Sequence, residues 1–164
     1  MPLVPPLNLA SLDPQNFVSE GLFGFVLGHE VHKATRLRYA LSILCLTPDL
    51  PSADATPGFV QQLARFATSQ LRATDLGSAL PPAAVTLLLI DAELRNLPGI
   101  LERLRIALEP LLLPALPKVQ PLTLSAGGGC YPQTATSGSE LLQQALDLMS
   151  RAKADGGNRL YLPG

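Results

Sequence analysis

Eight residues from Tyr39 to Leu46, YALSILCL, form a short and almost uniformly apolar run. A strand with one wet face alternates polar and apolar residues, whereas a strand that is buried on both faces reads as a continuous apolar run. The run therefore predicts a central strand with other elements packed on both sides of it. This restricts the chain to folds in which helices cover a sheet.

Segments with helical periodicity alternate with further strand-like segments along the chain. Helices are predicted over 17–36, 59–72, 93–109 and 139–154, and further strands over 75–80, 83–90, 119–130 and 159–162. Pro110 is expected to end the third helix, and Ser139 to cap the fourth. This order predicts an α/β (α+β) fold, with a mixed, mostly antiparallel sheet of about five strands flanked by helices.

The length of 164 residues fits one domain. Residues 1–14 contain four prolines and no clear periodicity, so a tail or linker is predicted over 1–16 and a domain over 17–164. The apolar segments are too short to cross a bilayer, and the N-terminus lacks the pattern of a signal peptide. We therefore expect a cytoplasmic protein without membrane insertion.

Charge and cysteine content exclude two classes of site. Twelve basic and thirteen acidic residues give a net charge of −1, which argues against nucleic-acid binding because that function needs a clustered positive field. Cys45 and Cys130 lie far apart and form no CxxC motif. They are interpreted as buried, reduced thiols.

Several pieces of sequence resemble one family in their order and spacing. LTLSAGGG at 122–129 precedes SELLQQALDLMSRAKADGGNRLY at 139–161, FVQQLARFATSQLRATD occupies 59–75, and LERLR occupies 101–105. From about Glu30 to Tyr161 they resemble GGDEF (diguanylate cyclase-like) domains. In that family a TxSxG strand leads to a helix ending in AKxxGxN, and another helix ends in the RxxD motif of an inhibitory product site. The resemblance implies the GGDEF fold, which is similar to the palm of nucleotidyl cyclases.

The resemblance also implies that the catalytic residues are lost. Pro81-Pro82-Ala83-Ala84-Val85 stands where the family has its GG(D/E)EF signature, and Thr47 stands at the first metal-binding aspartate, with Asp49 at the second aspartate of that motif. Proline removes a backbone N–H, and alanine offers no oxygen to a hard cation. Phosphoryl transfer depends on such positioned cations. The chain is therefore expected to be no enzyme and to hold no metal.

The family's product site is retained, in this register, at Arg72, Asp75 and Arg103. Arg72 and Asp75, at i and i+3 near a helix end, are expected to point into the same space. An arginine can bind phosphate oxygens or the O6/N7 edge of guanine in bidentate fashion, and an aspartate can accept from guanine N1–H and N2–H. The resemblance thus implies a receptor for cyclic di-GMP that needs no other cofactor, with a second protomer able to complete the site.

Other interpretations remain open. The chain can instead be a nucleotide-independent interaction or dimerisation scaffold, which binds a partner protein or a second copy through apolar surface at Leu111–Leu116 or the proline-rich N-terminus. Arg72 and Asp75 can form a solvated surface pair, and Arg103 can pair with a nearby acid or face solvent. GTP binding without turnover is a third possibility, which the two prolines disfavour because a phosphate cradle needs free N–H groups.

Four further features receive structural interpretations. Gly127–Gly129 are expected to form a tight bend or bulge, and Lys153 to lie at its helix end. Asp91 and Glu93 stand where a helix start favours acidic residues. His29 and His32 lie at i and i+3, the wrong spacing for an HExxH metal motif, and are expected to face solvent.

Overall fold

The structure of the chain is a computed structural model, and it describes residues 13–112 and 122–164. Most of the apolar segment Leu111–Leu116 and most of the proline-rich N-terminus lie outside the described residues. Within them, no helix is both long enough and apolar enough to cross a membrane.

Among the described residues, five strands form one sheet in the order β2-β3-β1-β4-β5. They are β1 (Leu41–Pro48), β2 (Leu76–Leu80), β3 (Ala84–Ile90), β4 (Leu124–Tyr131) and β5 (Arg159–Tyr161). Every pair in the sheet is antiparallel except β4 and β5, which are parallel. The predicted fold, a mixed and mostly antiparallel five-stranded sheet flanked by helices, is confirmed.

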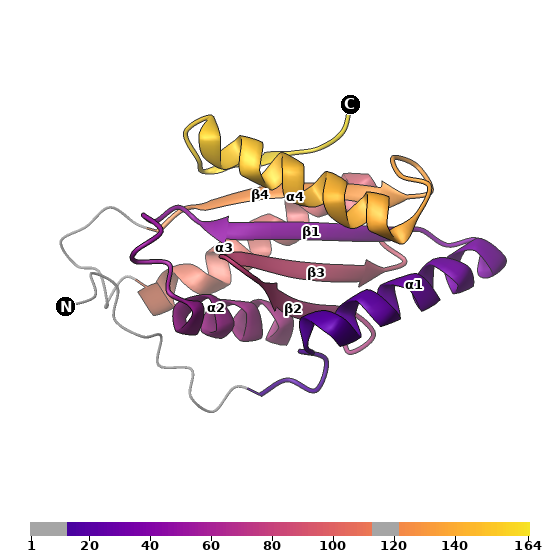
Figure 1. Cartoon of the computed structure of the whole chain (residues 1–164), viewed down its shortest axis with the longest axis horizontal. Coiled ribbons are helices and arrows are strands. Elements are labelled where there is room, and N and C mark those ends of the chain that lie inside the picture. The colour runs from indigo at the N-terminus through magenta and orange to yellow at the C-terminus, as the bar shows by residue number, and fades with distance from the viewer. Residues whose placement is uncertain (1–12, 113–121) are drawn as a thin grey trace.

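In the described part of the chain, four α-helices cover the two faces of this sheet (Figure 1). They are α1 (Glu20–Leu37), α2 (Pro57–Ser69), α3 (Leu97–Leu112) and α4 (Gly138–Ala154), and a short 3₁₀ helix, η1 (Leu94–Asn96), precedes α3. Buried side chains of α2 and α3 form one core with one face of the sheet, and those of α1 and α4 form a second core with the other face. The sheet is therefore the middle of three layers.

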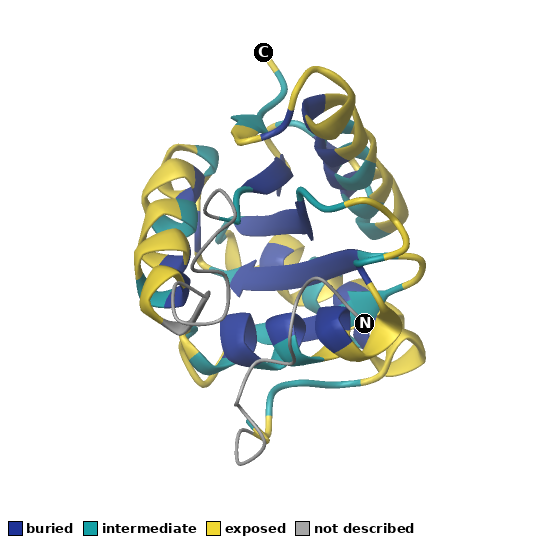
Figure 2. Cartoon of the chain, turned by 90° about the vertical axis from the view of Figure 1, so that its left-hand side faces the viewer, coloured by how far each residue is buried: buried dark blue, intermediate teal, exposed yellow. Residues whose placement is uncertain are grey.

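The central strand β1 is buried along its whole length, as Figure 2 shows by colour. Leu44 and Leu46 point into the core with α2 and α3, whereas Ile43 and Cys45 point into the core with α1 and α4. Cys45 and Cys130 are both buried and free, and burial raises the pKa of the Cys45 thiol far above its usual range. Both thiols are thus the buried, reduced groups that were predicted.

Three helix boundaries differ from the prediction. α1 begins at Glu20, because Ser19 Oγ accepts from the N–H of Leu22. α4 is capped by Ser137, whose Oγ accepts from Glu140 N–H at 3.1 Å, so the prediction of Ser139 as the cap is wrong. Pro110 lies inside α3, which continues to Leu112. A proline removes the N–H that would donate to the carbonyl four residues earlier, and this disruption falls only two residues before the end of α3.

The expected bend at Gly127–Gly129 is also wrong. These glycines lie in regular pairing with β1, with Gly127 opposite Cys45 and Gly129 opposite Ile43. A Cβ atom on Gly127 would lie 2.2 Å from the backbone oxygen of Ala145. Gly127 is therefore required because the backbone of α4 approaches β4 closely, whereas a Cβ on Gly128 or Gly129 would first meet side chains, those of Leu97 and Gln144.

The segment before α1 is attached to β2. Phe17 forms a parallel bridge with Gly77, and Gly77 N–H donates to Asn16 O at 2.9 Å. The side-chain amide of Asn16 donates to two more carbonyls, those of Arg72 at 3.2 Å and Asp75 at 3.0 Å. Arg65 on α2 lies over the Phe17 ring at 4.9 Å. The boundary drawn between a tail and a domain at residues 16 and 17 stays a prediction.

Candidate ligand-binding site

The RxxD tetrapeptide lies on the turn between α2 and β2. α2 ends at Ser69, three residues before Arg72, so Arg72 and Asp75 lie near a helix end, as expected, but beyond the helix that was predicted to reach Arg72. The turn is closed by Asp75 N–H, which donates to Arg72 O at 3.0 Å. The geometry of this turn, rather than helical spacing, therefore places the two side chains.

The carboxylate of Asp75 is buried and fully engaged with the turn and with β3. The residue is 3% exposed. Its Oδ1 accepts from Ile90 N–H at 2.9 Å, and its Oδ2 accepts from Arg72 N–H at 3.1 Å and from Arg72 Nε–H at 3.4 Å. Asp75 thus ties the turn to the last residue of β3 and orients the side chain of Arg72.

The guanidinium of Arg72 is held on one side and open on the other. Nε donates to Asp75, and Nη2 donates to the carbonyl of Ile90. The side chain is still 58% exposed, and the described residues provide no acceptor for Nη1. Arg72 therefore presents unused N–H donors from a fixed position.

Arg103 lies on the exposed surface of α3 and has no hydrogen bond or ion pair to any described residue. The nearby acidic residues of this helix form ion pairs with Arg105, which donates to Glu102 and lies 3.9 Å from Glu109. Hydrogen bonding from Arg105 lowers the pKa of Glu102 below its usual value. Because Glu102 and Glu109 pair with Arg105, they do not neutralise the charge of Arg103, which can therefore bind a ligand.

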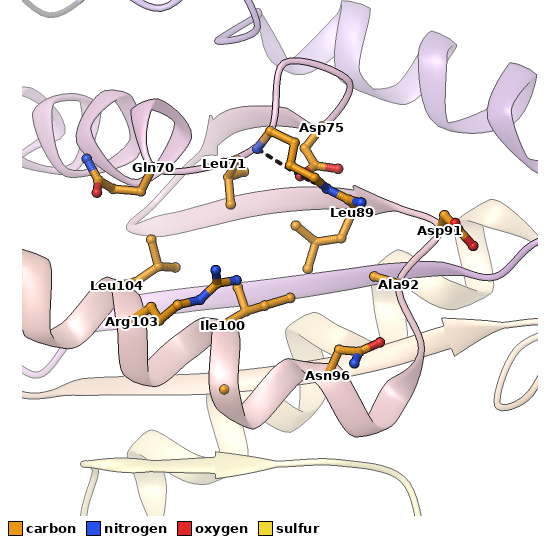
Figure 3. Close-up of a pocket in the computed structure, with 12 residues that line it drawn as sticks. Gln70, Leu71, Asp75, Leu89, Asp91, Ala92, Asn96, Ile100, Arg103 and Leu104 are labelled. Atoms are coloured by element: carbon orange, nitrogen blue, oxygen red, sulfur yellow. Dashed lines mark hydrogen bonds and ion pairs between the residues drawn. The ribbon is translucent and has the colours of Figure 1, made fainter.

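Arg72, Asp75 and Arg103 line the same cavity, which has a volume of about 670 Å³ (Figure 3). Its walls come from the end of α2, the RxxD turn, the end of β3, η1 and α3. The other residues that line it are Gln70, Leu71, Leu89, Asp91, Ala92, Asn96, Gly99, Ile100 and Leu104. In Figure 3, Asp75 lies on one side of this cavity, and Arg103 and Asn96 lie across it on the side of α3. The arrangement suits a ligand that carries negative charge.

Asp91 was missed as a cavity residue, because its place just before a helix suggested only a favourable charge at a helix start. It follows the last residue of β3 with a positive φ of 53°, and it is exposed. An aspartate in this left-handed conformation is unusual and marks a chain that turns sharply. This backbone conformation is what places Asp91 on the cavity wall, and it cannot be predicted from the sequence.

At the opposite end of the sheet, Thr47 and the segment Pro81–Val85 lie in a different chemical environment. Thr47 is buried, and its hydroxyl donates to the carbonyl of Ala83 at 2.7 Å. A second cavity of about 570 Å³ lies here, lined by Thr47, Ser52, Ala55, Leu80, Pro81, Pro82, Ala83, Ala84, Leu146, Met149, Ser150, Lys153 and Ala154. This lining contains no carboxylate, and most of its side chains are apolar.

Two charged side chains near this cavity, those of Asp49 and Lys153, form hydrogen bonds within the protein that stabilise the fold. Asp49 accepts from the hydroxyls of Thr123 and Ser125 and from Asn158 N–H. Lys153 Nζ donates to the carbonyls of Pro48 and Leu50, both at 3.2 Å. Lys153 therefore joins α4 to the end of β1 and does not bind the carbonyls of its own helix.

Within residues 13–112 and 122–164 the structure contains no group of three or more His, Cys, Asp or Glu side chains arranged to hold a metal ion. His29 and His32 are exposed on α1, as predicted.

Known structures share this fold, although no family model and no curated protein matches the sequence. The GGDEF domain of PA1120 (YfiN or TpbB) from Pseudomonas aeruginosa matches with a TM-score of 0.74 and 20% identity, over 90% of this chain and 96% of that one. The GGDEF domain of DgcB from Caulobacter crescentus, in complex with c-di-GMP, matches with a TM-score of 0.74 and 14% identity, over 93% of each chain.

A third match is the diguanylate cyclase SiaD from Pseudomonas aeruginosa, in complex with its activator SiaC. Its TM-score is 0.72 and its identity 20%, over 96% of this chain and 65% of that one. All three solved structures contain the same arrangement of sheet and helices over nearly the whole of this chain. The chain therefore has the fold of a GGDEF domain.

Proposed function

We propose that this chain is a catalytically inactive GGDEF-like domain that binds cyclic di-GMP through Arg72, Asp75 and Arg103. The observation that carries the proposal is that these three residues line one cavity, in which both guanidinium groups have unused donors. Cyclic di-GMP carries two phosphodiester anions and two guanines, which match such donors. Cavities of about 300–1,000 Å³ are typical of small-molecule sites, and this one falls in that range.

The three polar residues have different roles in this proposal. Arg103 and the open side of Arg72 bind phosphate oxygens or the O6/N7 edge of guanine. Asp75 contributes by holding Arg72, because its carboxylate fixes both the backbone and the Nε of that residue. The bound c-di-GMP of the similar DgcB domain supports this choice of ligand.

The proposed lack of catalysis rests on the hairpin between β2 and β3. Pro81 and Pro82 have no backbone N–H to offer a triphosphate, and the Thr47 hydroxyl donates to Ala83 O. The cavity beside them is lined mainly by apolar side chains. A hard cation prefers several oxygen ligands, so this lining suits neither Mg²⁺ nor a nucleotide that carries it.

Isothermal titration of the purified chain with cyclic di-GMP tests the binding proposal. We expect Arg72→Ala and Arg103→Ala each to weaken binding by about 10- to 100-fold, because each removes hydrogen bonds between charged groups. Arg105→Ala is the matched control: it lies on the same helix two residues from Arg103, but its guanidinium pairs with Glu102. Wild-type affinity in both cavity variants would refute this site.

A nucleotide-independent scaffold is the second candidate. The exposed side chains of Leu22 and Phe25 on α1 favour it, since Phe25 is 74% exposed. The complex of the similar SiaD with SiaC shows that a protein with this fold can bind a protein partner. Two results together would favour this candidate. The wild-type chain would bind no cyclic di-GMP, and the Arg72→Ala and Arg103→Ala variants would self-associate as the wild type does.

A further inference from the structure

The proposed site leaves one part of the ligand without an obvious partner. The Watson–Crick edge of guanine presents the N1–H and N2–H donors, which need an acceptor. Asp75 is poorly placed to supply it, because its carboxylate is 3% exposed and already accepts three hydrogen bonds. A carboxylate has about four acceptor sites, so three are occupied here. The acceptor must be sought elsewhere on the cavity wall.

Asp91 is the other carboxylate on this wall, and its environment differs from that of Asp75. It is exposed, it lines the cavity, and none of the described residues forms a hydrogen bond or ion pair with it. It directly follows Ile90, whose carbonyl accepts from the guanidinium of Arg72. Figure 3 shows Asp91 at the end of β3, on the rim of the cavity.

On the basis of the proposed function, we propose that Asp91 is the residue that reads guanine, by accepting from N1–H and N2–H of one base of cyclic di-GMP. In guanine, O6 lies between N7 and N1. A guanidinium on the N7 side of O6 and a carboxylate on the N1 side therefore read adjacent parts of one base. Arg72, whose guanidinium donates to the carbonyl of Ile90, and Asp91, the residue after Ile90, supply this pair of groups.

This assignment gives the site a means of rejecting adenine. Adenine has an acceptor at N1 and no amino group at C2, so its edge places a lone pair and a C–H against the carboxylate of Asp91. A site that desolvates such an acceptor without pairing it disfavours the wrong base. The same cavity with an uncharged residue at position 91 would lose most of this discrimination, although Arg72 would still contact N7 of either base and Arg103 would still bind a phosphate.

The backbone at Asp91 permits a clean variant. Its φ of 53° lies in the left-handed region, which asparagine and glycine also adopt readily. Asp91→Asn therefore removes the charge with little change of shape, and Asp91→Gly removes the side chain without backbone strain. Asp147→Asn is the matched control, because Asp147 is exposed on α4 and lines none of the cavity.

The experiment compares cyclic di-GMP with cyclic di-AMP on the wild-type chain and these variants, by titration calorimetry. We expect Asp91→Asn and Asp91→Gly to weaken cyclic di-GMP binding by about 10- to 100-fold and to leave or improve cyclic di-AMP binding, so that the ratio of the two affinities falls. Asp147→Asn should retain the wild-type ratio.

The outcomes separate the two proposals. If wild type binds cyclic di-GMP and both Asp91 variants keep its affinity and selectivity, the role of Asp91 is refuted and the proposed function stands. A loss of affinity for both dinucleotides by the same factor would also refute base reading. If wild type binds neither dinucleotide, both proposals fall together.

Discussion

Asp75 shows how a short motif can have a structural role that its sequence does not reveal. Its carboxylate accepts from the backbone N–H groups of Arg72 and Ile90, and the second of these lies fifteen positions further along the chain. The sequence indicates that Arg72 and Asp75 lie close together, and the structure agrees. That the carboxylate turns inward could not be predicted, because its partner on β3 becomes a neighbour only when the sheet forms.

Replacing Asp75 with alanine should therefore destabilise the fold itself. Two partly buried N–H donors would lose their acceptor and the buried carboxylate site would be left empty, so we expect a loss of about 2–4 kcal/mol in the free energy of unfolding. Urea unfolding followed by circular dichroism measures this. Asp147→Ala, at an exposed position on α4, should change stability by no more than about 0.5 kcal/mol. If Asp75→Ala were as stable as the wild type, the hydrogen bonds of the Asp75 carboxylate would not stabilise the fold, and a direct contact of this carboxylate with a ligand would become the better account of its role.

At the scale of elements, the sequence predicts which segments are helices and strands far better than it predicts where they touch. The apolar run at β1 and the periodicity of α2 are visible without a structure. The glycines of β4 are ambiguous, because a run of glycines marks either a bend or a close approach of backbones. Only the position of α4, which follows later in the chain, decides between these two.

Gly127→Ala tests this close approach. Its Cβ would lie 2.2 Å from both Ala145 O and Met149 N, and these backbone atoms can yield only if α4 moves away from the sheet. We expect a loss of at least about 3 kcal/mol in the free energy of unfolding, at the upper end of overpacking effects. Gly24→Ala is the control, since nothing lies within 4 Å of its added Cβ inside α1. It should stabilise the chain by about 0.5–1 kcal/mol, because alanine favours helix. Equal effects of the two substitutions in thermal unfolding would contradict this account.

At the scale of the whole molecule, the alternation of segments predicted the layered fold, and the structure confirms it. Arg103 could be placed opposite Arg72 only through the family resemblance, because the two lie 31 positions apart on different elements. The second cavity was beyond the sequence altogether, since its lining combines the end of β1, the β2–β3 hairpin and α4.

Ligand binding should also be visible as a change in the stability of the whole chain. A ligand present at about 100 times its Kd and bound only to the folded state adds about 2.7 kcal/mol. For a chain of this size, that corresponds to a rise in Tm of about 5–10 °C with cyclic di-GMP. GTP with Mg²⁺ should produce neither a comparable rise nor any cyclic product, since Pro81 and Pro82 have no N–H group and the segment Pro81–Val85 has no carboxylate. A product peak on chromatography would overturn the proposed lack of catalysis.

The side chain of Asn16 joins the segment before α1 to the RxxD turn. One amide group holds the carbonyls at both ends of the RxxD turn, and the backbone on either side of it is bonded to Gly77. A pull on the chain at Asp13 would load the ion pair of Asp13 with Arg65 on α2, and next the hydrogen bonds of Asn16 to the turn that holds Arg72. Tension on this segment would therefore disturb the position of Arg72, and a ligand bound to Arg72 would resist that disturbance.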